Sequence, residues 1–303
     1  MQPAASAASA PSRIVDTTID TGVKHSQFEH DRGESHKAMS DQEDIARAFV
    51  DARRQDAVLS SYPGAMPATL AQAYAIQDQA IAYDGRAVGG WKLGRINPRA
   101  VKQFGAERLA GPIFANSIIY PANADPVAVR VLSGFAAVEA EVLLLIAATP
   151  PANLSVQDAP EFVSEVRFGI EVASSPFVGI NGNGPAVTVS DFGNNFGLVV
   201  GPPILDATAP GAFDQMARLE IDGLLVGSGL VADLLDGPFG SLAFLARLMA
   251  ERGLRLEPGQ WISTGAITGV HPIRQGQHAR AMFGHDVAIE CTTVPALLPE
   301  SAV

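Results

Sequence analysis

Apolar runs that alternate with polar residues predict a chain rich in β-strands. The clearest covers residues 137–146, where Glu139 and Glu141 alternate with small or β-branched residues before a continuous aliphatic stretch. Successive side chains of a strand point to opposite faces, so the two glutamates are expected on one face and the intervening apolar residues on the other. The same criterion predicts a short strand within residues 85–94, and strands at residues 118–120, 166–172, 197–200, 217–221, 224–226, 261–264, 278–283 and 287–291.

Helical spacing of apolar residues is found mainly in the first third of the chain. It predicts helices over residues 41–54, 69–82 and 98–110, and a later one over 241–252 that Gly253 would end. Helices gather at the front and strands towards the back. We therefore expect an α+β fold rather than a doubly wound parallel sheet.

Polar composition without periodicity marks the beginning of the chain. Residues 1–38 are expected to form a disordered N-terminal extension, and Met39 is a candidate natural start. Residues 39–84 are expected to form a helical N-terminal segment that caps the main domain. That domain would occupy residues 85–303, where no repeat or break in composition suggests a further boundary.

Composition narrows the classes of partner. Of 303 residues, 47% are hydrophobic and 17% charged, and the formal net charge of -11 comes without a Lys/Arg cluster. Nucleic acid and anionic membranes are therefore not expected to bind. The single cysteine, Cys291, excludes an internal disulfide and is expected to be a packed thiol. No apolar run reaches the length of a membrane span, and the N-terminus lacks a secretory signal, so we expect a cytoplasmic protein.

Candidate chemistry starts with Glu139 and Glu141. Two neighbouring carboxylates in an apolar strand repel each other and resist desolvation, so a shared proton, Lys or Arg partners, solvent or a divalent cation must compensate them. No basic residue lies in the run, so a hard cation such as Mg²⁺ or Mn²⁺ is the most economical answer, and a wet face at a sheet edge is the alternative. Glu171 brings a third carboxylate into another apolar run. Lys92 lies in a glycine-rich apolar strand, where it is either a proton carrier with a lowered pKa or a residue whose stem covers the core.

Ordered motifs between about residues 74 and 291 resemble those of the fumarylacetoacetate hydrolase superfamily, in its branch of 2-keto-4-pentenoate hydratases and 4-oxalocrotonate decarboxylases. The motifs are Gly90-Trp91-Lys92-Leu93-Gly94, Glu139-Ala140-Glu141, Gly169-Ile170-Glu171-Val172 and Ser263-Thr264-Gly265-Ala266. The segment from 242 to 259 is similar to the family's late helix and following turn.

This resemblance implies a mixed β-roll core and makes residues 85–303 the catalytic domain. It implies that Glu139, Glu141 and Glu171 hold one Mg²⁺ or Mn²⁺. It further implies that Lys92, Glu139 and Asp191 are catalytic, with Lys92 as the proton carrier. Substrate would be bound by Leu93, Thr264 and Gly265, the last two through hydroxyl and backbone N–H groups.

Three segments depart from the family pattern. Arg95 stands where many of these hydratases carry Ser or Thr, and Ala173 follows the third ligand strand where an Asp is common. The family's Asp-Asn-Ala-Ser-Ser-Gly loop appears here as residues 191–197. These segments are expected to line the pocket, so they bear on the identity of the substrate rather than on the metal.

The resemblance implies a metal-dependent hydratase that adds water to a 2-hydroxy-2,4-dienoate, giving a 4-hydroxy-2-oxo acid, as in aromatic catabolism. It also leaves open decarboxylation of a 2-oxo-3-enedioate, C–C hydrolysis of an acylpyruvate and the role of a non-catalytic partner subunit. Hydrolysis would call for an early His-Glu pair, and residues 40–80 contain no histidine. The expected partners are a small-molecule substrate and further copies of the chain, or a sister decarboxylase or hydratase.

Overall fold

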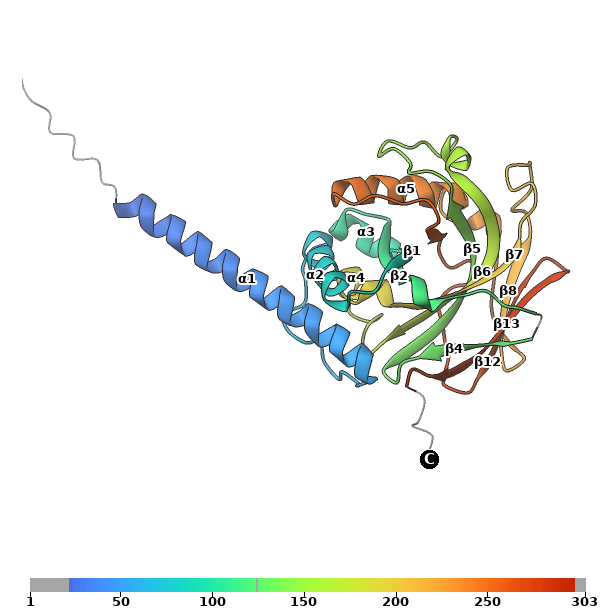
Figure 1. Cartoon of the computed structure of the whole chain (residues 1–303), viewed down its shortest axis with the longest axis horizontal. Helices are drawn as coiled ribbons and strands as arrows, with labels where there is room; N and C mark the ends of the chain where they lie inside the picture. Colours follow the sequence, from blue (N-terminus) through green and yellow to red (C-terminus); the bar gives the residue numbers. More distant parts are fainter. Residues whose placement is uncertain (1–21, 124, 298–303) are drawn as a thin grey trace, which may run out of the picture. The chain divides into compact units, whose positions relative to one another are not determined.

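The computed structural model describes residues 22–123 and 125–297. Among these residues it contains two β-sheets, of which the larger is mixed (Figure 1). Its strand order is β2-β1-β10-β5-β6-β7-β3, with β11 paired to β5. The strands are β1 (Val88–Arg95), β2 (Arg108–Phe114), β3 (Ile118–Ile119), β5 (Phe135–Ile146), β6 (Val163–Ser175), β7 (Asn195–Pro203), β10 (Trp261–Ser263) and β11 (His271–Pro272).

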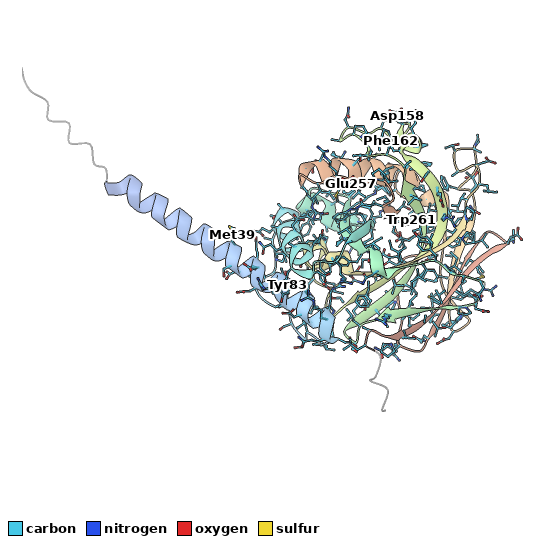
Figure 2. The ribbon with its side chains drawn as sticks, viewed as in Figure 1. Met39, Tyr83, Asp158, Phe162, Glu257 and Trp261 are labelled. Carbon is cyan, nitrogen blue, oxygen red and sulfur yellow. The ribbon has the colours of Figure 1, made fainter. Side chains whose placement is uncertain are left out.

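A second sheet has the order β4-β13-β12-β8-β9. Its strands are β4 (Val127–Val131), β8 (Met216–Ile221), β9 (Leu224–Leu230), β12 (His278–Phe283) and β13 (Val287–Pro295). Buried hydrophobic side chains from both sheets form one large cluster, which we call the main core. Within it the rings of Phe168 in β6 and Phe283 in β12 are stacked, with 4.3 Å between their centroids. Cys291 is fully buried in this core, which raises the pKa of its thiol to about 12 and confirms the packed thiol. Figure 2 shows the side chains that fill these layers.

The α-helices are α1 (Gly22–Gln55), α2 (Leu70–Asp84), α3 (Pro98–Phe104), α4 (Pro185–Ser190) and α5 (Gly237–Glu251). Short 3-10 turns are η1 (Ala115–Ser117), η2 (Ala159–Phe162), η3 (Phe192–Asn194) and η4 (Val231–Asp233). The Thr69 side chain caps the start of α2 by accepting from the Gln72 amide, and Gly85 ends the helix at φ 75°. The helices predicted over residues 69–82 and 241–252 are therefore confirmed.

The first helix begins earlier than the sequence predicted. α1 starts at Gly22, so residues 22–38 are helical in the structure although the sequence indicated a disordered extension. Periodicity detects helices with a buried face, and this polar, proline-free segment offers no such signal. Residues 1–21 lie outside the described residues, and disorder there stays a prediction.

The chain divides into compact units of residues 1–40 and 41–303. In the first unit the described residues belong to α1, and the second unit contains both sheets. The boundary predicted at residue 84 stays a prediction.

The prediction of a helix over residues 98–110 was wrong in its second half. α3 ends at Gly105, whose φ of 68° and N–H bond to the Val101 carbonyl stop the helix. Residues 108–114 are β2, a fully buried strand paired antiparallel to β1. Pairing with a strand some twenty residues earlier overrode the local helical pattern, which is the usual way in which tertiary context defeats propensity.

Candidate metal centre and active site

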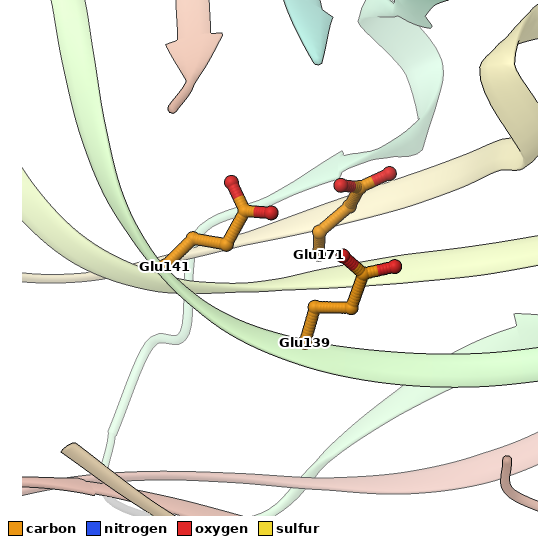
Figure 3. A group of neighbouring side chains, drawn as sticks. All are labelled: Glu139, Glu141 and Glu171. Carbon is orange, nitrogen blue, oxygen red and sulfur yellow. The ribbon is translucent and has the colours of Figure 1, made fainter. Parts of the chain in front are cut away.

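Three glutamates on two neighbouring strands converge on one point (Figure 3). Glu139 and Glu141 are two residues apart on β5, and Glu139 lies opposite Glu171 in the antiparallel ladder with β6. One carboxylate oxygen of each residue lies within 4.8 Å of the others. The apolar residues that alternate with the β5 glutamates belong to the main core, so the predicted division of faces is confirmed. We call Glu139, Glu141 and Glu171 the glutamate trio.

The three buried carboxylates of the glutamate trio outnumber the basic side chains that contact them in the described part of the chain. Its members are at most 2% exposed, and Lys92, also buried, places its Nζ 3.1 Å from Glu171 Oε1. Three trio oxygens have no hydrogen-bond partner: Glu139 Oε1, Glu141 Oε1 and Glu171 Oε2. Desolvation therefore raises the pKa of Glu139 to about 8 and that of Glu141 well above its usual range. Such a group must either hold protons or bind a cation.

The donor set fits a hard divalent cation. It consists of carboxylate oxygens alone, which Mg²⁺ and Mn²⁺ prefer over softer ligands. Two oxygens that both bind Mg²⁺ at about 2.1 Å lie at most about 4.2 Å apart, so the trio needs only a small contraction to reach ligating distance. The three unpartnered oxygens are the atoms that a cation would satisfy.

Lys92 contacts the trio from β1. Its Nζ also donates to Asn194 Oδ1 at 3.2 Å. Burial alone would lower the pKa of Lys92, but the charges of Glu171, Glu139 and Glu141 together raise it above its usual value. The lowered pKa that the apolar strand suggested is thus not found, because the sequence does not reveal which side chains face the ammonium group. Lys92 is a protonated residue in this setting.

The segment 191–195 covers Lys92 and is fastened by a buried ion pair. Arg53 of α1 donates from Nε to Asp191 Oδ1 at 2.5 Å, and Ser175 Oγ donates to Asp191 Oδ2 at 2.6 Å. Further Arg53 nitrogens donate to the carbonyls of Ser174, Asp191 and Asn195. Within the described residues Asp191 makes no hydrogen bond to Lys92 or the trio. Its catalytic role stays a prediction, and its contacts are those of a positioning residue.

Two asparagines of this segment were missed by the sequence reasoning. Asn194 accepts from Lys92, and Asn195 Nδ2 donates to Glu171 Oε1 at 3.0 Å. The available signal was a pair of amides in a glycine-rich loop. Gly193, at φ 61°, lets the segment approach closely, because a Cβ there would lie 3.1 Å from Gly111 Cα and 3.2 Å from Lys92 Cδ.

The end of β10 and the turn after it hold the carboxylate of Glu141. Glu141 Oε2 accepts from Ser263 Oγ at 2.5 Å and from the Gly265 N–H at 2.9 Å. Thr264 Oγ1 donates to the Val142 carbonyl at 2.8 Å, so its hydroxyl is held by β5. Ser263 was missed as a partner of Glu141, although it stands in the quoted motif.

The three residues expected to bind substrate line one cavity. Leu93, Thr264 and Gly265 belong to the wall of a cavity of about 310 Å³ at the end of β1 and β10. The Leu93 side chain itself is buried in the main core. The structure therefore brings these residues together, and their role in binding stays a prediction.

Comparison with known proteins supports a common ancestry for most of the chain. Residues 113–298 match the family model described as Fumarylacetoacetate (FAA) hydrolase C-terminal. A 4-oxalocrotonate decarboxylase from a Pseudomonas species is 30% identical over 146 residues, which are 47% of this chain and 55% of that protein. A 2-oxo-hept-4-ene-1,7-dioate hydratase from Escherichia coli is 31% identical over 111 residues, which are 35% of this chain and 40% of that protein. The matches thus span about half the length of these relatives or less.

A solved structure shares the fold over nearly its whole length. The 4-oxalocrotonate decarboxylase from Pseudomonas putida G7, complexed with magnesium and adipate, superposes with a TM-score of 0.69 at 20% identity, covering 86% of this chain and 98% of its own. This likeness confirms the predicted mixed β-roll fold. Among the described helices, none combines the length and the apolar character that crossing a membrane requires.

Proposed function

This chain belongs to the fumarylacetoacetate hydrolase family, and on that premise we propose that it is a divalent-metal-dependent hydratase of a 2-hydroxy-2,4-dienoate. The observation that carries the proposal is the glutamate trio, buried with three unpartnered oxygens beside a single lysine. Water would add to the conjugated system to give a 4-hydroxy-2-oxo acid. The names of two relatives, a hydratase and a decarboxylase, agree with chemistry on substrates of this kind.

Each residue of the site would have a role in metal binding or in proton transfer. Glu139, Glu141 and Glu171 would hold Mg²⁺ or Mn²⁺, which when bound supplies Lewis-acid stabilisation for negative charge at the substrate's 2-oxygen. Lys92, which contacts Glu171 and Asn194 and whose pKa the surrounding carboxylates raise, would donate a proton to the far end of the dienoate. Glu139, ionised when the cation is bound, would take the proton of the attacking water through a carboxylate oxygen that does not bind the cation.

A second candidate is decarboxylation of a 2-oxo-3-enedioate. It is favoured by the 4-oxalocrotonate decarboxylase whose structure superposes over 98% of its length. The same residues serve this reaction, because loss of carbon dioxide also leaves an enolate that a nearby acid must protonate. Lys92 would be that acid.

Acylpyruvate hydrolysis and a non-catalytic role find less support. Hydrolysis of an acylpyruvate requires a base to activate water, yet His271 and His278 contact the Thr268 carbonyl and Glu290 rather than the trio. A non-catalytic subunit would have no reason to keep three mutually repelling carboxylates beside Lys92. Assembly into a homo-oligomer, or with a sister enzyme, stays a prediction.

The decisive experiment follows the absorbance of 2-hydroxypenta-2,4-dienoate and of its dicarboxylate homologue 2-hydroxyhepta-2,4-dienedioate with the Mg²⁺- or Mn²⁺-loaded protein. We expect the diene absorbance to disappear with time. EDTA should prevent this loss, and Lys92→Ala should lower its rate by a factor of about 10² or more. Lys102→Ala, on the exposed surface of α3, is the matched control and should retain wild-type activity.

Two outcomes contradict the hydratase assignment. Carbon dioxide released from a 2-oxo-3-enedioate, without hydration of either dienoate, assigns the decarboxylase reaction instead. Activity that survives EDTA and Lys92→Ala removes the proposed site from the chemistry altogether.

A further inference from the structure

Four arginines that lie far apart in the sequence line one cavity. Arg53 and Arg54 come from α1, Arg86 from the segment between α2 and β1, and Arg130 from β4. The cavity has a volume of about 550 Å³, which is in the range of small-molecule sites. Among the described residues, Asp84 is the one acidic member of its wall. A chain with a formal net charge of -11 thus gathers a local excess of positive charge here.

Two of these guanidinium groups already have a buried carboxylate as partner. Arg53 pairs with Asp191, whose side chain is fully buried. Arg86 donates from Nε to Asp84 Oδ1 at 2.6 Å and from Nη2 to Asp84 Oδ2 at 3.0 Å. The charges of Arg53 and Arg86 are therefore balanced within the protein, so they are not the groups that a ligand would neutralise.

The other two arginines are not balanced in this way. Arg54 donates from Nη2 to the carbonyls of Tyr83 and Asp84, which hold the guanidinium group in place without neutralising it. Its contact with Asp51, at 3.5 Å between half-exposed side chains, is a weak ion pair. Arg130 is exposed, and its side chain forms no hydrogen bond or ion pair within the described part of the chain. Two guanidinium groups of one cavity are therefore available to an anion.

Apolar residues share the cavity wall with the arginines. They are Ile119, Val129, Phe196, Leu198 and Leu297. A phosphate monoester carries about two negative charges near pH 7 and presents three acceptor oxygens, which suits two guanidinium groups that each bind in a bidentate manner. An apolar or aromatic group attached to the phosphate would contact the remaining wall.

This cavity is separate from the glutamate trio. Neither the trio nor Lys92 belongs to its wall. Val172, which does, directly follows Glu171 on β6, and successive side chains of a strand point to opposite faces of the sheet. A ligand in the cavity would therefore not reach a cation held by the trio.

We propose that Arg54 and Arg130 bind the phosphate group of a soluble phosphate monoester, whose apolar part packs against Phe196. The inference goes beyond the proposed function and does not depend on it, because no residue assigned to metal binding or proton transfer takes part. It gives the protein a second small-molecule site.

Calorimetry with three matched probes and the full-length protein tests this site. Phenyl phosphate carries both parts of the expected ligand, inorganic phosphate carries the charge alone, and phenol carries the ring alone. We expect phenyl phosphate to bind about tenfold more tightly than inorganic phosphate, because its ring is buried, and phenol to show no measurable binding. The affinity for phenyl phosphate should be the same in Mg²⁺ and in EDTA, since the trio takes no part.

Substitutions assign the two arginines. Arg54→Ala and Arg130→Ala should each weaken the binding of phenyl phosphate by about tenfold or more, because each removes charge-assisted hydrogen bonds. Arg130→Lys should retain part of the affinity, since it keeps the charge without the planar fork. Arg218→Ala is the matched control: Arg218 is an exposed arginine of β8, in the same sheet as β4, and does not line the cavity. This variant should bind as wild type does.

Three results would overturn the inference. Binding that requires Mg²⁺ would place the probe at the trio instead of the cavity. An affinity that neither Arg54→Ala nor Arg130→Ala lowers would exclude these residues as the phosphate ligands. Succinate has two negative charges but no phosphate group, and binding of succinate as tight as that of phenyl phosphate would contradict the assignment of a phosphate monoester.

Discussion

Glu139 and Glu171 lie directly opposite each other in the antiparallel ladder of β5 and β6, both buried and both on the face turned away from the main core. Directly opposed like charges destabilise a sheet, and burial increases the cost. Their arrangement therefore favours a role in binding a cation over a contribution to folding.

Removing one carboxylate should abolish metal-dependent stabilisation without harming the metal-free fold. Saturating Mg²⁺ or Mn²⁺ at a hundred times its Kd is expected to stabilise the wild type by about 2.7 kcal/mol. Glu139→Gln should lose that gain, while its metal-free Tm stays within about 2 °C of wild type or rises, because repulsion is relieved. Thermal unfolding with and without metal measures both values. Glu161→Gln, exposed at η2, should behave as wild type.

Metal affinity should increase with pH. Burial raises the pKa of Glu139 to about 8, so below that value the folded, metal-free protein holds a proton that the cation must displace. Apparent affinity is therefore expected to rise by about tenfold for each pH unit and released proton between pH 6 and 8, and the raised pKa of Glu141 extends the dependence to higher pH. Calorimetry in buffers of different ionisation enthalpy counts the released protons. An affinity that is flat between pH 6 and 8 would show that the trio is already ionised.

The Arg53–Asp191 pair should contribute strongly to stability. Both side chains are at most 3% exposed, so Arg53→Ala or Asp191→Asn leaves a buried charge without its partner. We expect a loss of about 3–5 kcal/mol in the free energy of unfolding, measured by urea denaturation. Arg54→Ala changes the neighbouring, half-exposed arginine and should cost less than about 1 kcal/mol. Comparable losses in the two arginine variants would refute the anchoring role of Arg53.

Gly193→Ala should impair the site more than a matched glycine substitution. Gly193 and Gly105 share a positive φ, at 61° and 68°, so an alanine at either position bears a similar backbone strain of about 1 kcal/mol. A Cβ at Gly105 meets nothing within 4 Å, whereas one at Gly193 approaches Gly111 and Lys92. The expected result is a larger loss of stability and a lower kcat for Gly193→Ala. Equal effects of the two substitutions would mean that segment 191–195 does not position Lys92.

Local patterns in the sequence determined much of this protein. Alternation in β5 placed Glu139 and Glu141 on one face, because side-chain direction along a strand depends only on position. Capping residues located α2, and ordered motifs identified the family and the three glutamates. Local patterns gave the wrong structure where a strand from another part of the chain was available for pairing. At β2 the pairing with β1 replaced the second half of the predicted helix.

Only the tertiary structure decided how these residues meet. The register that sets Glu139 opposite Glu171, and the pairing of Arg53 with Asp191 across 138 positions, depend on strand pairing and packing that no local pattern encodes. The direction of the Lys92 pKa shift reversed for the same reason, since three carboxylates from other strands surround it. A residue's type and neighbours in sequence set its possible chemistry, whereas electrostatic interactions depend on distances through space.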